Sequence, residues 1–221
     1  FTEDYLDDAD GYARYRRATA WNPPIADDID AHLMSFLRSI QKGEPAHGTV
    51  HAYRSPNTDL AGVVLERAAG TRLNQLLSDL LWKPAGTRSD AMMSVDRLGV
   101  ARAAGGMSTT ARDLARIGEL VRMNTGAVVP KSWIEDLWTG GNHDIWKASD
   151  QGDIFPKGRY RSYWYSTGEG ELAAIGIHGQ WMWIDPENEV VIVKQSSDPL
   201  PTDESNEQPT INMLRKVATS I

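Results

Sequence analysis

A tyrosine in front of an apolar segment is the residue whose surroundings best suit catalysis. Tyr53 lies in the run His51-Ala-Tyr-Arg-Ser-Pro-Asn-Thr-Asp-Leu-Ala-Gly62, just before a stretch that ends at Gly70. The phenol of a free tyrosine has a pKa of about 10, so it acts as a base near neutral pH only beside a cation that lowers this value. If Tyr53 is catalytic, the protein must therefore also supply a cation.

One literal Ser-x-x-Lys occurs in the sequence, at Ser39-Ile-Gln-Lys42. A serine nucleophile of this pattern belongs at the N-terminus of a long buried helix, with the lysine one turn further on. Ser39 instead stands in the last turn of a predicted helix that stops at Gly43. We interpret this match as a coincidence, and no other serine has a lysine at this spacing.

Two histidines have a spacing that zinc sites use on helices. His47 and His51 are four residues apart, but Gly48 and the β-branched pair Thr49 and Val50 argue against a helix that would align them. No third ligand is evident, so no metal site is predicted. The absence of cysteine excludes disulfides, iron–sulfur clusters and a thiol nucleophile; it is compatible with a cytoplasmic location without establishing one.

Composition limits the classes of partner. The chain has 221 residues, of which 41% are hydrophobic and 24% charged, enough for one large domain or two small lobes with an apolar core. A net charge of −7 argues against a nucleic-acid partner, because no basic stripe is present to neutralise phosphates. No apolar run approaches the length of a membrane span, so no membrane partner is expected.

The residues around Tyr53 resemble the Tyr-x-Asn region of penicillin-recognising serine hydrolases, the serine β-lactamase and penicillin-binding-protein superfamily. The resemblance continues through Leu-Leu-Trp82-Lys-Pro84-Ala-Gly86, and Gly105–Arg116 is also similar to this superfamily. More narrowly, the region resembles the branch of 6-aminohexanoate-dimer (nylon oligomer) hydrolases and related carboxylesterases. In that branch the third position is often serine, as at Ser55; Asn57 is the alternative substitute for the usual asparagine.

The resemblance implies a two-step acyl transfer without a cofactor. The serine of Ser-x-x-Lys attacks the acyl carbon, and the lysine is the cation beside Tyr53, which passes a proton to the leaving group. Ser55 would orient the tyrosine–lysine pair by a hydrogen bond. Because a convincing Ser-x-x-Lys is absent, we interpret the chain as the C-terminal part of such an enzyme, with the nucleophile on a missing N-terminal segment.

A glycine-containing stretch near the end of the chain resembles the strand that lines the active site of the superfamily. Counting back from Asp185-Pro186, Ala174-Ile-Gly-Ile-His-Gly-Gln180 falls where the superfamily has Lys-Thr-Gly. In this alignment Gly176 lets the substrate approach closely, the N–H of Ile177 is one donor of the oxyanion hole, and His178 lies among the substrate-binding residues.

An alternative alignment makes Gly179 the motif glycine and the N–H of Gln180 the donor. In the first alignment the usual lysine and threonine have become Ala174 and Ile175. Those two residues normally hold the carboxylate of a β-lactam or a peptidyl-D-alanine. Their loss disfavours a β-lactamase or D,D-peptidase and suits a smaller or less anionic amide or ester.

Two further aromatic residues have competing interpretations. Tyr5, in Phe1-Thr-Glu-Asp-Tyr5, resembles the tyrosine on a mobile loop that closes over the substrate in nylon-oligomer hydrolases; the alternative is an exposed loop aromatic. Trp164, in Tyr163-Trp-Tyr165, would line the acyl pocket or belong to the core.

The elements that must position these residues change in character near residue 155. Helices are predicted over 12–20, from Asp27 or Asp28 to Lys42, from Thr58 or Asp59 to Ala69, over 73–81, after a cap at Ser108 or Thr109, over 133–138 and over 210–220, which Pro209 starts. Residues 139–158 are predicted to be a surface loop. Strands are predicted over 172–184 and 189–196, with a turn at 185–188.

We therefore expect an α+β fold of the β-lactamase/D,D-peptidase type. Residues 1–155 would form a mostly helical lobe, and 156–221 the C-terminal part of an antiparallel sheet with a flanking helix. The expected function is that of a serine hydrolase for small amides or esters, whose partners are that substrate and the missing N-terminal segment. An inactive homologue or fragment that acts as a binding module is the alternative, a β-lactamase or D,D-peptidase is a third, and a homodimer is compatible with the sequence.

Overall fold

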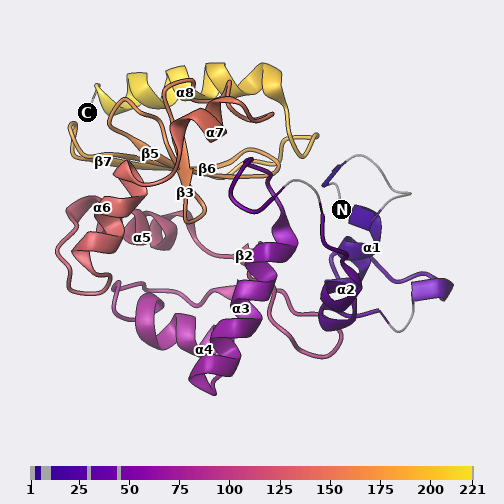
Figure 1. Cartoon of the computed structure of the whole chain (residues 1–221). Helices are drawn as coiled ribbons and strands as arrows, with labels where there is room; N and C mark the ends of the chain where they lie inside the picture. The colour runs from indigo at the N-terminus through magenta and orange to yellow at the C-terminus, as the bar shows by residue number, and fades with distance from the viewer. Residues whose placement is uncertain (1–2, 6–10, 29–30, 44–45, 221) are drawn as a thin grey trace. The chain divides into compact units, whose positions relative to one another are not determined.

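The computed structural model describes residues 3–5, 11–28, 31–43 and 46–220 (Figure 1). The chain forms two compact units, which are described separately. The first comprises Phe1–Ala46, Ala52–Lys83 and Ser89–Thr109. The second comprises His47–His51, Pro84–Arg88 and Thr110–Ile221.

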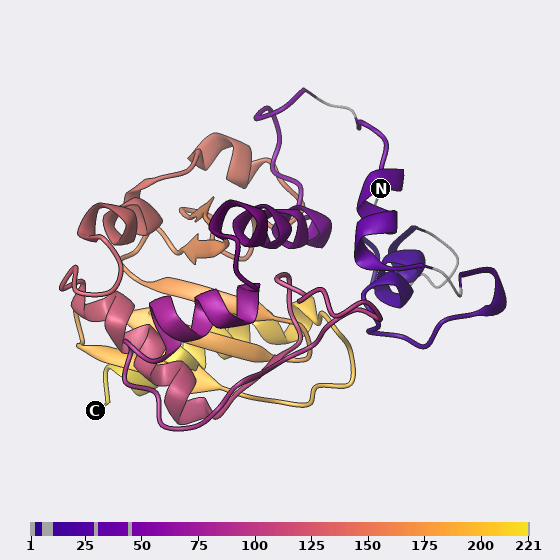
Figure 2. The ribbon, with the colours of Figure 1, turned by 90° about the horizontal axis from the view of Figure 1, so that it is seen from below.

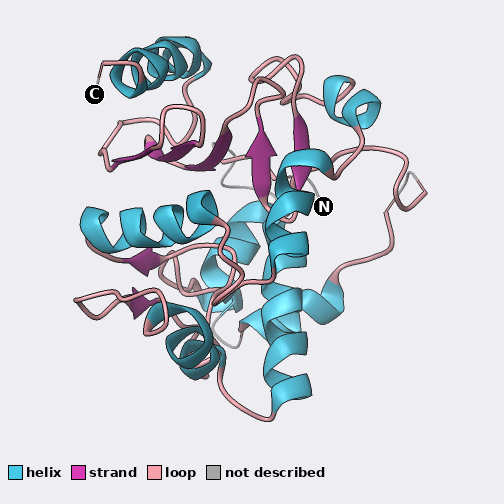
Figure 3. Cartoon of the chain, turned by 90° about the vertical axis from the view of Figure 1, so that its left-hand side faces the viewer, coloured by secondary structure: helices cyan, strands magenta, loops and turns pink. Residues whose placement is uncertain are grey.

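Helices dominate the first unit, and among its described residues the named strands are the two-residue pair β1 and β2 (Figure 3). Its elements are α1 (Gly11–Ala18), η1 (Ala26–Asp28), α2 (Leu33–Ser39), α3 (Ser55–Ala69), α4 (Leu73–Leu77), the π-helical turn η2 (Ser78–Trp82), β1 (Met92–Met93) and β2 (Met107–Ser108). An aromatic core joins α1 to α2, made of Tyr12, Tyr15, Ala18, Leu33 and Phe36. This core supports the segment that carries Tyr5, which packs against it.

A five-stranded antiparallel sheet is the centre of the second unit. Its strands follow one another in the order β3 (Arg159–Arg161), β4 (Trp164–Ser166), β5 (Leu172–Gly176), β6 (Gln180–Asp185) and β7 (Val190–Lys194). Helix α8 (Glu204–Ala218) covers one face of the sheet, and α5 (Ala111–Met123) and α6 (Lys131–Thr139) cover the other (Figures 1 and 2). The short helix α7 (His143–Lys147) lies beside β3.

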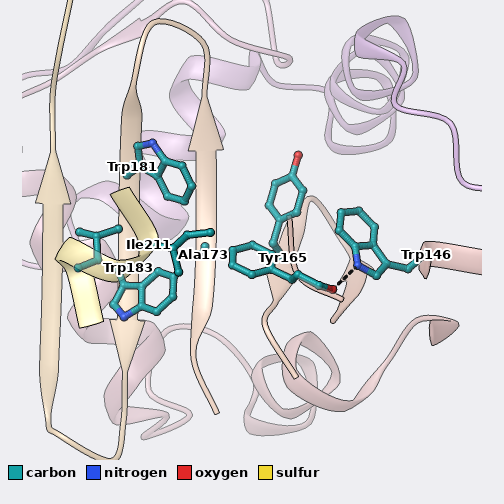
Figure 4. Packing of buried hydrophobic residues seen from close by; sticks show 8 residues of the cluster. Trp146, Tyr165, Ala173, Trp181, Trp183 and Ile211 are labelled. Carbon is teal, nitrogen blue, oxygen red and sulfur yellow. Dashed lines mark hydrogen bonds between the residues drawn. The ribbon is translucent and has the colours of Figure 1, made fainter. Parts of the chain in front are cut away.

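Alternation along β6 divides the core of this unit in two. Successive side chains of a strand point to opposite faces, and Trp181 and Trp183 accordingly pack with Ile211 of α8, as Figure 4 shows. Met182 and Ile184 pack on the other face against α5 and α6. Trp146 of α7 closes the first cluster and donates its indole N–H to the carbonyl of Phe155 at 2.9 Å.

The predicted α+β fold is confirmed, with several changes at the ends of elements. Helix α3 begins at Ser55 rather than at Thr58 or Asp59, and ends as predicted at Gly70, whose φ is +65°. Helix α2 is capped by His32, not by Asp27 or Asp28, and ends at Ser39; residues 29–30 lie outside the described residues.

The caps of two later helices also differ. Thr110 caps α5, because its hydroxyl accepts from the N–H of Asp113, so neither Ser108 nor Thr109 has this role. Helix α8 begins six residues before the predicted start at 210, with Asp203 as its cap, and Pro209 lies inside it. The capping carboxylate and the acidic first turn stabilise the start of α8.

The predicted strand 172–184 is two strands joined by a turn at 177–179, and the predicted loop 139–158 contains α7. The helices α1–α7 precede residue 155 and the five-stranded sheet follows it. A division into lobes at that residue stays a prediction.

Candidate functional site

Tyr53 lies two residues before α3 in the first unit. Arg54, in extended conformation, is the N-cap residue, and Pro56 suits the first turn because it needs no N–H partner there. The guanidinium of Arg54 donates to the carbonyl oxygen of Tyr53 at 2.6 Å. The start of α3 therefore restrains the backbone on the C-terminal side of Tyr53.

A carboxylate from the N-terminal segment occupies the start of α3. Glu3 Oε2 accepts from the N–H of Ser55 at 2.6 Å, and Glu3 Oε1 accepts from the Ser55 hydroxyl at 2.6 Å. A negative charge at this position is favourable, because the first N–H groups of a helix lack partners within it. The hydroxyl hydrogen of Ser55 is thus donated to Glu3.

Glu3 also binds the predicted substrate-covering tyrosine. The hydroxyl of Tyr5 donates to Glu3 Oε1 at 2.9 Å. The Tyr5 ring packs edge-on against the ring of Tyr12, with 5.0 Å between the ring centroids. Burial, followed by the charges of Glu3, Tyr12 and Tyr53, raises the pKa of Tyr5, so its phenol stays protonated. Glu3 therefore joins Tyr5 to Ser55, and Tyr53 lies close enough to Tyr5 to influence its pKa.

Asp59, for which the sequence predicts only a role at the start of a helix, is a structural centre of this unit. Its side chain is fully buried, and its carboxylate accepts from the Tyr15 hydroxyl and from the N–H groups of Ala103 at 2.7 Å and Ala104 at 2.8 Å. Burial raises the pKa of Asp59. Its position on the same helical face as Gly62 and Val63, three and four residues later, was the signal that it would be buried.

The predicted oxyanion donor lies in a tight turn of the second unit. Gly176 is the last residue of β5, and the turn Ile177-His178-Gly179 leads into β6. His178 has a φ of +59° and Gly179 a φ of +77°. Among the backbone hydrogen bonds that the described residues make around this turn, none uses the N–H of Ile177.

Trp164 lies in β4 and is partly buried against the core cluster on the face that α5 and α6 cover. The alternative of a core residue thus has direct contacts in the structure. Gln180, the donor of the alternative alignment, begins β6, and its side chain donates to the carbonyls of His178 and Ser196.

The coincidental motifs have structural roles. Ser39 is the last residue of α2, its hydroxyl donates to the carbonyl of Phe36 at 2.7 Å, and the following Ile40 is extended, so Lys42 is not on the same helix. His51 packs against the rings of Trp146 and Tyr160. Across the described ranges no three His, Cys, Asp or Glu side chains form a group suited to a metal ion, and none of the helices there is long and apolar enough to cross a membrane.

Comparison with known proteins identifies the class. Residues 5–214 match the model of the Beta-lactamase family, and the chain therefore belongs to the beta-lactamase family. Within the family, it is 36% identical over 207 residues to the 6-aminohexanoate-dimer hydrolase of Paenarthrobacter ureafaciens. That match covers 91% of this chain and 52% of the relative, so the chain spans about half the length of the curated relative.

Solved structures agree with this assignment. A proposed 6-aminohexanoate-dimer hydrolase from Bacillus anthracis is similar with a TM-score of 0.79 and 25% identity, over 99% of this chain and 57% of that one. Simvastatin synthase from Aspergillus terreus shares the fold, with a TM-score of 0.65 and 14% identity, over 95% of this chain and 67% of that one. The β-lactamase-like fold expected from the sequence is confirmed.

Proposed function

We propose that this chain is the part of a serine hydrolase for small amides or esters that carries the proton shuttle and one oxyanion donor. The 207-residue similarity to a 6-aminohexanoate-dimer hydrolase is the observation that carries the proposal. The nucleophile and its lysine would come from polypeptide outside residues 1–221, because the single Ser-x-x-Lys of the chain begins at the end of α2.

In the proposed mechanism, serine attack on the acyl carbon forms an acyl-enzyme and releases the amine or alcohol. Tyr53 takes the proton of the serine hydroxyl and gives it to that leaving group, and water then hydrolyses the acyl-enzyme and frees the serine. The start of α3 supports this role, since it restrains the backbone that follows the Tyr53 side chain. Ser55 and Tyr5 both donate to Glu3 and would therefore lie on the same side of the site.

The N–H of Ile177 would stabilise the oxyanion of the tetrahedral intermediate. Two facts support this donor. Within the part of the chain that the structure describes, the N–H makes no hydrogen bond in its turn. Gly176 also ends a strand, as the motif glycine should, whereas Gly179 lies within the turn. Removing one such donor typically lowers kcat by about 10²–10³-fold. With Ala174 and Ile175 in place of a charged anchor, the substrate would be a weakly anionic amide or ester.

The proton shuttle is tested by Tyr53→Phe in the polypeptide that joins this chain to its Ser-x-x-Lys segment. Expulsion of an amine requires protonation, whereas p-nitrophenoxide leaves unaided. Hydrolysis of an anilide should therefore fall by about 10²–10⁴-fold, and hydrolysis of the matched p-nitrophenyl ester much less. Tyr163→Phe, on an exposed tyrosine, is the control. Equal losses on both substrates would leave Tyr53 without a role as a proton donor.

The position of Ser39 favours a second candidate, a non-catalytic homologue that keeps only the binding surface. Under this alternative, no polypeptide containing the chain would hydrolyse either substrate. Covalent labelling by a penicillin would instead indicate a β-lactamase or D,D-peptidase.

A further inference from the structure

The turn between β5 and β6 is held by the segment that follows β7. The N–H of His178 donates to the carbonyl of Pro201 at 2.9 Å, and the N–H of Asp198 donates to the carbonyl of His178 at 3.2 Å. The ammonium of Lys194 donates to the carbonyl of Gly179 at 3.0 Å and lies 3.7 Å from the carboxylate of Asp198. The side-chain amide of Gln180 joins the carbonyls of His178 and Ser196.

This arrangement keeps His178 in a conformation that few non-glycine residues adopt. A φ of +59° is left-handed, where asparagine, aspartate and histidine are tolerated better than branched residues. Such conformations persist when the surrounding contacts determine them, and they are frequent at functional sites. The backbone bonds on both sides of His178 provide those contacts.

The same segment determines which ring nitrogen of His178 carries the hydrogen. Nδ1 lies 2.8 Å from the carbonyl oxygen of Asp198, and a carbonyl oxygen can only accept. Nδ1 is therefore the donor, and Nε2 of the neutral ring is an acceptor. Among the described residues Nε2 has no hydrogen-bond partner. It is also absent from the buried polar atoms that lack a partner, so it is accessible to solvent.

From this geometry we infer that His178 is a specificity-determining residue that presents Nε2 to an N–H donor of the substrate, such as the ammonium of an ω-amino acyl group. The inference rests on the proposed function, since the N–H of the preceding residue, Ile177, is the proposed oxyanion donor. The turn would then offer the substrate a donor and an acceptor on consecutive residues. An acyl chain that ends in a methyl group lacks the N–H and would leave Nε2 without a partner.

The tautomer can be measured on this chain alone. Long-range ¹H–¹⁵N spectra of the imidazoles, at a pH where they are neutral, should show a protonated Nδ1 and an unprotonated Nε2 for His178. His32 is an internal reference with the opposite expectation, because its Nδ1 accepts from the N–H of Ser35. His178→Gly, which tolerates the left-handed backbone, assigns the signal by its loss. A hydrogen on Nε2 of His178 would overturn the inference.

Kinetics of the polypeptide that contains the Ser-x-x-Lys segment test the recognition itself. The preference, expressed as kcat/KM, for a 6-aminohexanoyl over a heptanoyl p-nitrophenyl ester should fall roughly 3- to 30-fold in His178→Gly, the size of one hydrogen bond. His178→Asn should restore part of it. Gln180→Leu, which loosens the turn but keeps the imidazole, should slow both esters equally.

The two proposals fail in different ways. An unchanged preference in His178→Gly would contradict the role of His178. So would a loss of preference in Gln180→Leu as large as the loss in His178→Gly. No hydrolysis of either ester by the unsubstituted polypeptide would instead contradict the proposed function.

Discussion

At the scale of the residue, the buried carboxylate of Asp59 joins three segments of the first unit. It holds α3 to α1 through Tyr15 and to the segment at Ala103 and Ala104. These three bonds therefore hold the helix that follows Tyr53, the proposed proton donor. Arg102, buried over the rings of Tyr15 and Trp21, supplies a positive charge beside the carboxylate.

Two substitutions of Asp59 should separate the contribution of its acceptor oxygens from that of its charge. Asp59→Ala leaves three buried donors without an acceptor and should cost about 3–5 kcal/mol of unfolding free energy. Asp59→Asn keeps an oxygen for the two N–H groups and should cost about 1–2 kcal/mol. Urea denaturation measures both, and equal losses would mean that the side-chain oxygen contributes nothing.

Asp59 should also make stability depend on pH. Burial raises its pKa, so the folded state holds the proton more tightly than the unfolded chain does. This contribution to stability is complete below the ordinary aspartate value and is lost as the pH rises through the raised value. The Asp59→Asn variant should lack this decline. If the stability of Asp59→Asn depends on pH as that of the unsubstituted chain does, groups other than Asp59 cause the decline.

Gly179 is the second residue with a specific conformational requirement. Its φ is +77°, and an added Cβ would lie 2.0 Å from a carboxylate oxygen of Asp198. Gly179→Ala should therefore destabilise the chain by roughly 1–3 kcal/mol. Gly48→Ala is the matched control, since its φ is also +77° and, among the described residues beyond its chain neighbours, no atom lies within 4 Å of its added Cβ. Equal unfolding midpoints for the two variants would contradict the close approach of Asp198.

Residue-level prediction from the sequence succeeded where a local pattern carries the information. The end of α3 at Gly70 follows from the left-handed conformation that glycine permits. The contact of Ser55 with Glu3 could not be predicted, because it joins residues 52 positions apart. The roles of Tyr53 and Ile177 stay predictions.

At the scale of the element, the cap of α5 distinguishes the structure from the sequence prediction. Thr110→Ala removes the hydroxyl that accepts from the N–H of Asp113 and should cost about 0.5–2 kcal/mol. Ser108→Ala, in exposed β2, should change stability by less than about 0.5 kcal/mol. Thermal unfolding of both variants measures this, and the reverse order would restore Ser108 as the cap.

The strand predicted over 172–184 shows why element boundaries were missed. Ile177 continues the apolar composition of β5, and the turn contains no proline or Asn-Gly pair that would indicate a turn in the sequence. Its direction is set instead by contacts with the segment after β7, about twenty residues later. Similarly, Asp203 caps α8 although Pro209 suggested a later start.

At the scale of the whole molecule, the chain combines a helical unit that carries Tyr53 with a sheet unit that carries Ile177. The overall α+β class was predictable, because the change from helical to strand composition is long and strong. The division into two units was not predictable, since each unit is assembled from three separate stretches of sequence.

The position of the acylated serine decides whether this chain lacks the nucleophile. Incubation with a fluorophosphonate, followed by peptide mass spectrometry, should find no serine of this chain labelled above background. The polypeptide that also contains the Ser-x-x-Lys segment should be labelled on that serine, outside residues 1–221. Labelling of a serine within the chain, with loss of ester hydrolysis in its alanine variant, would contradict the proposal that the chain lacks the nucleophile.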